Sequence, residues 1–462
     1  MDKINALYNS ERFLSIVFLL WLATMPFGAF VGSLSLGVMT IYPNLIVTIF
    51  LLPLCVVTFL KWTKLQWAFV VIVALLLIHC IVWGLLNGFN KNAIFDTRSV
   101  LFYLLFTMIL FSIYTSRHWE ILRSVLVKGI RYYFIIVLVA GIIELFTGVH
   151  LVGSFTDKLA TQPVNGNFYA PIFIYDNPNT YLTYFVGLFG LMILVDTKLR
   201  ANFWLKIAVL LVMLIFAFYA SSRFVVMISC GWIIVELLSQ VKAIQFSKAY
   251  LWIFAGVLGG ALLLAKHSFF LGPKYGSQTQ KFVVNELDVV IDHGDSLSVR
   301  PARALFPEER YSELVDAYYR AAGPFSDDLR KNLVLNGWEF IKERPVFGIG
   351  PGQYREYLDQ GRGKYETDTL RSPHNYVIEM WSQYGLLAVV YFVFFAVILL
   401  KLLTSKISWA DKKSYLLVFI AFGILMMVPS GFLLLDINWL FMPIVLIATQ
   451  VMQAPKSSEI HG

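Results

Sequence analysis

The stretch WAFVVIVALLLIHCIVWGLL, residues 67–86, decides the fold class of this chain. It contains no charged residue, and its length is about the 20 apolar residues that an α-helix needs to cross the core of a bilayer. A strand of a membrane β-barrel would alternate apolar and polar side chains, which this stretch does not do. It therefore predicts a transmembrane helix.

Apolar runs of this kind recur along the chain. Of its 462 residues, 58% are hydrophobic and only 14% are charged, which excludes a soluble globular domain. We predict an all-α polytopic membrane protein with about 12 transmembrane helices, each of the length that a bilayer requires. The predicted helices lie near residues 13–30, 42–60, 67–86, 99–115, 129–147, 179–195, 203–219, 224–240, 249–271, 376–400, 414–432 and 437–453.

Lys and Arg residues predict the orientation of these helices, because short connectors rich in them lie on the cytoplasmic side. They fall on alternate connectors, so both termini are predicted to be cytoplasmic. Helices 1 to 9 occupy residues 1–271, an outer loop domain occupies 272–375, and the last three helices with a cytoplasmic tail occupy 376–462. The connector residues are Lys61, Lys64, Arg117, Arg123, Lys128, Lys198, Arg200, Lys206, Lys242, Lys248, Lys401, Lys406, Lys412 and Lys413.

The net charge of +8 follows from these connectors. Because the basic residues are dispersed, no nucleic-acid partner is predicted. Cys55, Cys80 and Cys230 each lie in an apolar run, where a thiol behaves as a small hydrophobic group, so neither a disulfide nor a metal site is predicted. The stretch from Asp292 to Asp295 lacks the spacing of a calcium loop and is predicted to be a solvated turn.

The outer segment is rich in charged residues, Pro and Gly, which predicts a small, partly helical domain. Ser326 is the predicted N-cap of a helix whose apolar residues recur at helical spacing as far as Pro345. The glycine-rich run from Gly348 to Gly352 follows. It predicts a tight turn, because glycine tolerates positive φ; close approach of this backbone to a phosphate is the alternative.

The stretch Arg371-Ser372-Pro373-His374-Asn375 joins this segment to the apolar run 376–400. Pro373 is tolerated in a first helical turn, so the helix is predicted to begin with His374 inside or beside that turn. A helix N-terminus disfavours imidazolium, which would keep His374 neutral and able to accept a proton. The alternative is a histidine that merely anchors the helix end. Asn375 is predicted either to orient His374 or to hold a sugar, and Arg371 is a further candidate for substrate binding.

Three arginines are candidates for binding an anion. Arg98 and Arg223 are predicted at outer helix ends, and Arg330 lies on the predicted helix that leads towards His374. Each guanidinium presents a planar fork that matches phosphate oxygens, so their convergence would form a diphosphate clamp. The alternative is that they reach towards lipid headgroups, as Arg at helix ends often does.

Other polar residues lie near helix ends. Asn177-Pro178-Asn179 predicts the turn that starts a helix, with hydrogen bonding of Asn179 to a sugar as the alternative. Glu144 and Glu236 lie near the ends of apolar runs and are predicted to extend towards the membrane interface. Central membrane charges are few, which disfavours a proton-coupled transporter.

Several of these residues form an ordered series of blocks, and this series resembles the shared domain of the bacterial O-antigen ligases and O-antigen polymerases. Arg223, and the Asn179 element before it, match further positions of that family. Many members carry an arginine just before this Asn-Pro-Asn element, whereas Tyr169 to Asp176 contain none, so its role would fall to Arg98 or another residue. The blocks are Arg330–Trp338, Glu343–Tyr354, Ser372–Tyr376 and Gln383–Leu386.

The resemblance implies a metal-independent, cofactor-free, inverting glycosyltransferase of the C-type membrane class. Its donor would be a glycan on undecaprenyl diphosphate, and its site would face the periplasm from the bacterial inner membrane. His374 would be the base for the acceptor hydroxyl, while Arg223 and Arg330 would stabilise the leaving diphosphate. A chain-length regulator protein is a further candidate partner.

Two activities remain open within this family. A polymerase would extend a lipid-linked repeat unit, and a ligase would attach the polymer to lipid A–core; the long stretch 272–325 slightly favours the polymerase. Outside the family, an exporter of lipid-linked sugars would not need His374. A structural scaffold for an envelope assembly would need neither His374 nor Arg223.

Overall fold

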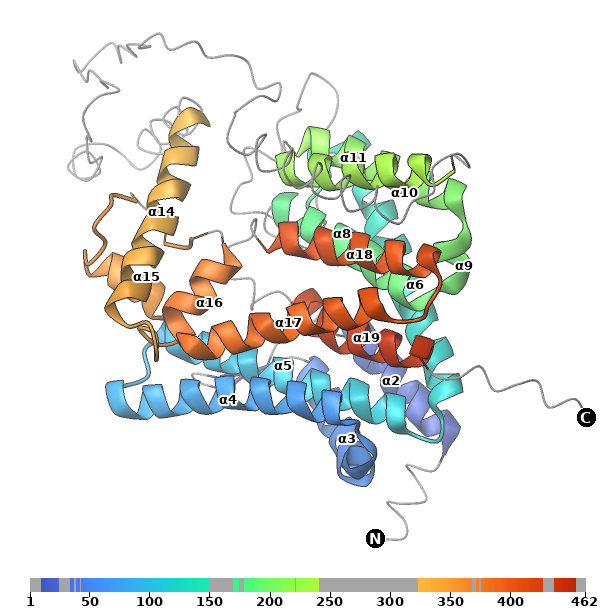
Figure 1. The fold of residues 1–462 in the computed structure, drawn as a ribbon, viewed down its shortest axis with the longest axis horizontal. Coiled ribbons are helices and arrows are strands. Elements are labelled where there is room, and N and C mark those ends of the chain that lie inside the picture. The colour runs from blue at the N-terminus through green and yellow to red at the C-terminus, as the bar shows by residue number, and fades with distance from the viewer. Residues whose placement is uncertain are drawn as a thin grey trace, which may run out of the picture.

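The computed structural model describes residues 10–24, 34–36, 39–41, 43–149, 169–173, 178–220, 222–240, 323–367, 371–373, 375–426 and 436–453. These residues are mostly helical (Figure 1). The helices are α2 (Glu11–Thr24), α3 (Pro43–Thr58), α4 (Lys64–Asn87), α5 (Lys91–Thr115), α6 (Trp119–Thr147), α8 (Pro178–Val195), α9 (Thr197–Ala201), α10 (Phe203–Tyr219), α11 (Arg223–Leu238), α14 (Gly323–Glu343), α15 (Gln353–Asp359), α16 (Tyr376–Tyr384), α17 (Leu386–Thr404), α18 (Trp409–Leu425) and α19 (Asp436–Gln453), with a 3₁₀ turn at Phe59–Lys61.

A helix lies in each predicted apolar run except 249–271, which is outside the described residues, as are 25–30 and 427–432 at the ends of two other runs. Five of the described helices are long and apolar enough to cross a membrane, namely α4, α5, α6, α8 and α17. The apolar helices within α3, α10 and α19 are shorter. The chain is therefore a helical, multi-pass membrane protein, whereas the total of about 12 crossings stays a prediction based on the length of each apolar run.

Helix α5 lies at the centre of the bundle, in contact with α3, α4, α6 and α19. Its Phe106 ring stacks on Trp439 of α19, with centroids 5.3 Å apart. The hydroxyl groups of Tyr103 and Tyr391 lie 3.0 Å apart and join α5 to α17. Because a buried hydroxyl needs a hydrogen-bonding partner, this pair satisfies two polar groups within an apolar core.

Local sequence explains where the central pair of helices begins. The Thr63 side chain accepts a hydrogen bond from the Gln66 backbone, and the Gln66 side chain accepts one from the Thr63 backbone, which is a capping box for α4. The Asn90 side chain accepts from the Ala93 backbone and caps α5. The cap at Asn90 places the start of α5 at Lys91, so the predicted outer helix end at Arg98 is wrong: this arginine lies inside the helix.

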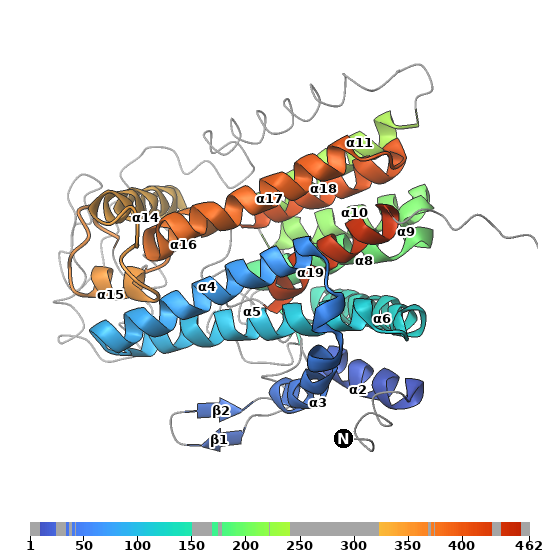
Figure 2. The same ribbon diagram turned by 60° about the horizontal axis from the view of Figure 1, so that its bottom comes forward.

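The described residues agree with the predicted all-α class, to which Leu34–Leu36 and Met39–Ile41 add a small antiparallel hairpin, β1 and β2 (Figure 2). Two further predictions of local structure are wrong. The apolar run 376–400 is not one helix, because Gly385, with φ of 56°, separates α16 from α17. Helix α14 begins at Gly323, so Ser326 lies inside it and is not its N-cap.

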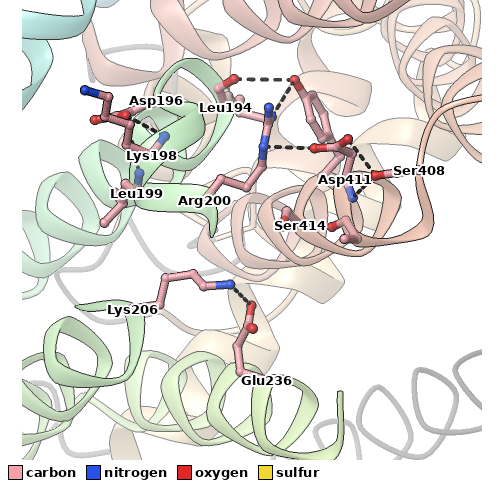
Figure 3. Close-up of polar contacts among 12 residues, drawn as sticks. Leu194, Asp196, Lys198, Leu199, Arg200, Lys206, Glu236, Ser408, Asp411 and Ser414 are labelled. Carbon is pink, nitrogen blue, oxygen red and sulfur yellow. Dashed lines mark hydrogen bonds and ion pairs between the residues drawn. The ribbon is translucent and has the colours of Figure 1, made fainter. Parts of the chain in front are cut away.

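Ion pairs join the ends of α9, α10, α11 and α18, and Figure 3 shows two of them, Arg200 with Asp411 and Lys206 with Glu236. The Glu236 carboxylate accepts from Lys206 Nζ and Lys413 Nζ, each at 2.8 Å, and these side chains are only 1%, 5% and 9% exposed. Glu236 is thus held inside the protein, and the prediction that it extends to the interface is wrong. Arg200 Nε lies 3.0 Å from Asp411 Oδ1, so two connectors predicted on the cytoplasmic side meet at one end of the bundle.

Asp196 links a further helix to this end of the bundle. Its carboxylate pairs with Arg131 of α6 and accepts hydrogen bonds from the backbone of Lys198 and Leu199 at the start of α9. Burial raises the pKa of Asp196, but the hydrogen bonds from Arg131 and Leu199 outweigh burial and hold the pKa below its usual value. The carboxylate is therefore the charged partner that fixes the turn between α8 and α9.

The Glu236→Gln variant tests the network. Removing the negative charge shared by Lys206 and Lys413 leaves buried ammonium groups without their counter-charge, and we expect a loss of about 3–5 kcal/mol of stability. Thermal unfolding of the detergent-solubilised protein measures this loss. Glu339→Gln, which removes a surface partner of Lys342, is the control and should leave the unfolding temperature unchanged. Equal unfolding temperatures for Glu236→Gln and wild type would contradict the assignment.

Candidate functional site

Helices α14, α15 and α16 gather at one end of the bundle, and α9 lies at the other (Figures 1 and 2). Helices α14 and α15, with the turn between them, share a small core of their own beside the main core of the bundle, to which the buried residues of α16 belong. The Tyr354 hydroxyl within it donates a hydrogen bond to the Leu333 backbone carbonyl and ties α15 to α14. The core residues are Leu333, Phe340, Ile349, Tyr354, Tyr357 and Leu358.

The glycine-rich run between α14 and α15 forms the predicted tight turn. Gly348, Gly350 and Gly352 have φ of 69°, 105° and 72°, a region that side chains rarely adopt. A Cβ on Gly352 would lie 2.4 Å from the backbone of Asn92 at the start of α5, and a Cβ on Gly350 would lie 2.0 Å from the Trp83 ring. The turn therefore needs glycine both for its conformation and for its close contact with α4 and α5.

Backbone hydrogen bonds fix this turn to the break between α16 and α17. Ile349 N donates to Ser382 O at 2.8 Å, and Gly350 N donates to Gln383 O at 3.1 Å. On the other side of Gly385, Leu386 N donates to Val346 O at 2.9 Å. The break at Gly385 leaves backbone N–H and C=O groups without partners inside a helix, and the glycine-rich turn supplies their hydrogen-bond partners.

Asp96 connects the same turn to the bundle. Its Oδ2 accepts a hydrogen bond from Gly352 N at 2.9 Å, and Asp96 lies two residues before Arg98 in α5. The prediction from sequence missed this residue. An acidic side chain in the first turns of an otherwise apolar helix was the available signal.

The chain leaving α15 folds back along α14. The Asn336 amide group donates to Tyr365 O at 2.7 Å and accepts from Tyr365 N at 2.8 Å, so one side chain replaces a strand partner. Asn336 is fully buried, as such a pair of bonds requires. The return segment is therefore fixed to α14 before it enters the stretch 371–375.

The stretch 371–375 lies between α15 and α16. Arg371 Nε lies 2.5 Å from Asp359 Oδ1 at the end of α15. The Asn375 side chain accepts from Ile378 N at 3.1 Å and is the N-cap of α16, a role that neither sequence alternative included. His374 lies outside the described residues, but its neighbours Pro373 and Asn375 are described. Because α16 begins at Tyr376 with Asn375 as its N-cap, His374 directly precedes the N-cap in the sequence, which agrees with the prediction of a position beside the first turn rather than inside it.

Asn179, Arg223 and Arg330 belong to different helices. Arg330 is exposed on α14, which packs on α16 through the contact of Gly337 with Ile378. Arg223 is the first residue of α11, and Asn179 is the second residue of α8, whose start at Pro178 was predicted. Helix α8 ends beside α9, and α10 begins there. The start of α8 and the end of α10 therefore lie about one helix length, or ~25 Å, from α9, towards the end of the bundle that carries α14.

Arg98 lies inside α5, away from the ends of this helix. Its guanidinium is 5.0 Å from the centroid of the Phe95 ring, one turn earlier in α5. A cation over an aromatic face is stabilised by the ring quadrupole. Arg98 thus has a structural contact within its own helix, close to the Asp96 that holds the glycine turn.

The sequence predicted that Glu144, near the end of α6, extends to the membrane interface. This prediction is wrong, because the side chain is buried. Its Oε2 accepts hydrogen bonds from Ile172 N and Phe173 N, each at 2.7 Å. Phe173 has φ of 51°, which is unusual for a side-chain-bearing residue and directs the two N–H groups onto one carboxylate. Glu144 therefore fixes the segment that leads into α8 and Asn179.

Residues 180–393 match the family model of the O-antigen ligases. The resemblance inferred from sequence is confirmed over this stretch, which runs from α8 into α17 and contains Arg223, Arg330 and the stretch 371–375. Asn179 and Arg98 lie outside it.

A curated relative supports the same family. The teichuronic acid biosynthesis protein TuaE of Bacillus subtilis (strain 168) is 25% identical over 138 residues. This match covers 28% of each chain, so the chain spans well under two thirds of that relative. The glycine turn and the capped α16 lie within residues 180–393, the stretch that matches the family model of the O-antigen ligases.

Two glycines with nearly the same φ test the role of the glycine turn. Gly352→Ala places a Cβ against the α5 backbone at φ of 72°, whereas Gly361→Ala has φ of 73° and open space. Both variants lose about 1–2 kcal/mol from backbone strain. We expect a larger drop in unfolding temperature, and faster proteolysis between α14 and α16, for Gly352→Ala alone. The same drop for both variants would contradict the close contact.

Substitutions of Asn375 separate capping from recognition of a sugar. Asn375→Ser retains an N-cap, while Asn375→Ala loses about 1 kcal/mol. We expect the unfolding temperature to fall for Ala and not for Ser. Should Ser and Ala destabilise the protein equally, the capping role is refuted.

Proposed function

We propose that this protein is an inverting membrane glycosyltransferase, with a glycan on undecaprenyl diphosphate as donor and a sugar hydroxyl as acceptor. The observation that carries the proposal is the position of the stretch 371–375. Arg371 and Asn375 hold its two ends, beside α14, within the part of the chain that matches the O-antigen ligases. His374 lies between these two residues in the sequence, and a general base requires a preorganised position.

The reaction assigns one role to His374. The acceptor oxygen attacks C1 of the donor's reducing-end sugar, and its proton passes to the His374 imidazole. The bond from C1 to the diphosphate oxygen breaks, the electron pair leaves with undecaprenyl diphosphate, and the configuration at C1 inverts. No metal ion or cofactor is required in this scheme.

The arginines have the complementary role. As the C1–O bond breaks, negative charge accumulates on the diphosphate, and the guanidiniums of Arg223 and Arg330 stabilise it. Arg98 and Asn179 are second candidates for binding the donor, and Arg371 and Asn375 for binding the acceptor. The position of α8 and α11, with their first residues towards the end that carries α14, supports a shared site.

We place this site on the periplasmic face of the bacterial inner membrane, with both termini in the cytoplasm. The alternate basic connectors support this orientation. Of the two family activities we favour the polymerase, which joins lipid-linked repeat units, because of the long segment 272–325. The ligase that transfers the finished glycan to lipid A–core is the second candidate, and a chain-length regulator protein would accompany the polymerase.

The deciding experiment is transfer in proteoliposomes with a defined undecaprenyl-diphosphate-linked repeat unit. We expect His374→Ala to lower the rate by ~10²–10⁴, the range of general-base catalysis, and Arg223→Ala to lower it by ~10²–10³. Gln360→Ala, which changes an exposed residue after α15, is the control and should be fully active. Transfer at the wild-type rate by His374→Ala, at an unchanged unfolding temperature, would refute the mechanism. No transfer by the wild type itself would favour an exporter.

A deletion strain separates the two family activities. Loss of the polymer with a single repeat unit still attached to lipid A–core indicates a polymerase. Bare core with accumulated lipid-linked polymer indicates a ligase.

A further inference from the structure

One side of α17 is an exposed aliphatic stripe. Its residues recur at helical spacing, so they share one face. Exposed aliphatic side chains along a membrane-spanning helix are its lipid-facing surface, because a soluble surface would carry polar groups there. The stripe consists of Leu386, Val390, Val393, Val397 and Leu400.

Exposed apolar residues continue beyond the outer end of this stripe. Leu386 is 54% exposed, and its N–H binds the Val346 carbonyl, so the turn that follows α14 lies directly beside it. Val346 is exposed, and the next residue, Phe347, is 74% exposed. An aromatic side chain so exposed next to a lipid-facing stripe indicates that this turn also meets lipid.

Two tryptophans lie beside the same turn. Trp338 of α14 and Trp381 of α16 are in edge contact, with ring centroids 5.8 Å apart. Trp381 O accepts from Gly385 N, the residue before Leu386, so the pair adjoins the start of the stripe. Tryptophan is enriched at the level of lipid headgroups, where its ring is half apolar and its N–H is solvated.

Basic side chains lie on the same elements as this patch. Lys331, Lys342 and Arg344 are exposed on α14 and on the residue that follows it, and Lys342 and Arg344 pair with Glu339 and Glu343. Aromatic and aliphatic side chains flanked by Lys and Arg are typical of a surface that lies in the interfacial layer of a membrane. Anionic headgroups would add attraction to each of these cations.

We propose that Trp338, Val346 and Phe347 form a membrane anchor that lies in the outer leaflet at headgroup depth. The occupant of this surface is lipid, because the patch is continuous with the lipid-facing side of α17. The backbone bonds of the turn to α16 and α17 make the anchor rigid with respect to the helix that starts at Asn375. The anchor therefore sets the height of the stretch 371–375 above the bilayer, where a lipid-linked diphosphate would lie under the proposed function.

The test uses an environment-sensitive fluorophore and does not depend on transfer activity. Cys230 is the one exposed cysteine among the described residues, so Cys230→Ser gives a background for labelling Phe347→Cys, with Trp338→Cys as a second position. Val393→Cys in the stripe is the lipid-facing reference, and Gln360→Cys after α15 is the aqueous reference. Each labelled protein is reconstituted in vesicles that contain brominated phospholipid.

We expect blue-shifted emission at 347 and 338, with stronger quenching by bromines near the headgroup than by bromines near the chain ends, and weak quenching by aqueous iodide. Val393 should respond more to bromines near the chain ends. Water-like emission with iodide quenching, as at 360, would overturn the anchor. Protection from both quenchers would also overturn it, because another protein surface or a second copy would then cover the patch.

Discussion

The end of the bundle that carries α14, α15 and α16 depends on the pairing of two short backbone segments, which are the turn after α14 and the junction at Gly385 between α16 and α17. Gly348 and Gly385 each leave no room for a Cβ, because the backbone of Gln383 or Val346 lies about 2.3 Å from where one would stand. Only two glycines permit this approach, and only at this approach do Ile349, Gly350 and Leu386 find their hydrogen-bond acceptors. The break between α16 and α17 and the turn after α14 therefore stabilise each other.

The two ends of the bundle are built by different physical means. The end at α9 is held by buried ion pairs around Glu236, where each charge is costly to leave unpaired, and by the half-exposed pair of Asp196 with Arg131. The end that carries α14, α15 and α16 is held by backbone contacts, caps and a small aromatic core. There Arg371 pairs with Asp359, and Asn375 caps α16. A site that must admit large, charged glycan substrates is better served by this second arrangement.

The sequence predicted helix positions well, because apolar runs report helices directly; α10 at 203–219 is an example. It failed where tertiary contacts decide. The run 376–400 contains Glu379, Ser382 and Gln383 before Gly385, a polar break that the prediction did not use, and the turn at Val346 supplies the partner for this break. Glu144 and Glu236 were predicted at the interface. The prediction failed because their burial depends on Phe173, Lys206 and Lys413, which are distant in sequence. Among the site residues, the start of α8 and the glycine turn followed from local rules, while the contacts of Asp96 and Asn375 did not.

The central claim is that one cavity at the end of the bundle that carries α14, α15 and α16 binds the diphosphate of the donor. An experimental structure with undecaprenyl diphosphate bound tests this claim most directly. The account predicts diphosphate oxygens within hydrogen-bonding distance of the Arg223 and Arg330 guanidiniums, with the His374 ring facing the same cavity. A diphosphate bound at the opposite end, near Arg200 and Lys206, or a His374 ring turned away from it, would contradict the account.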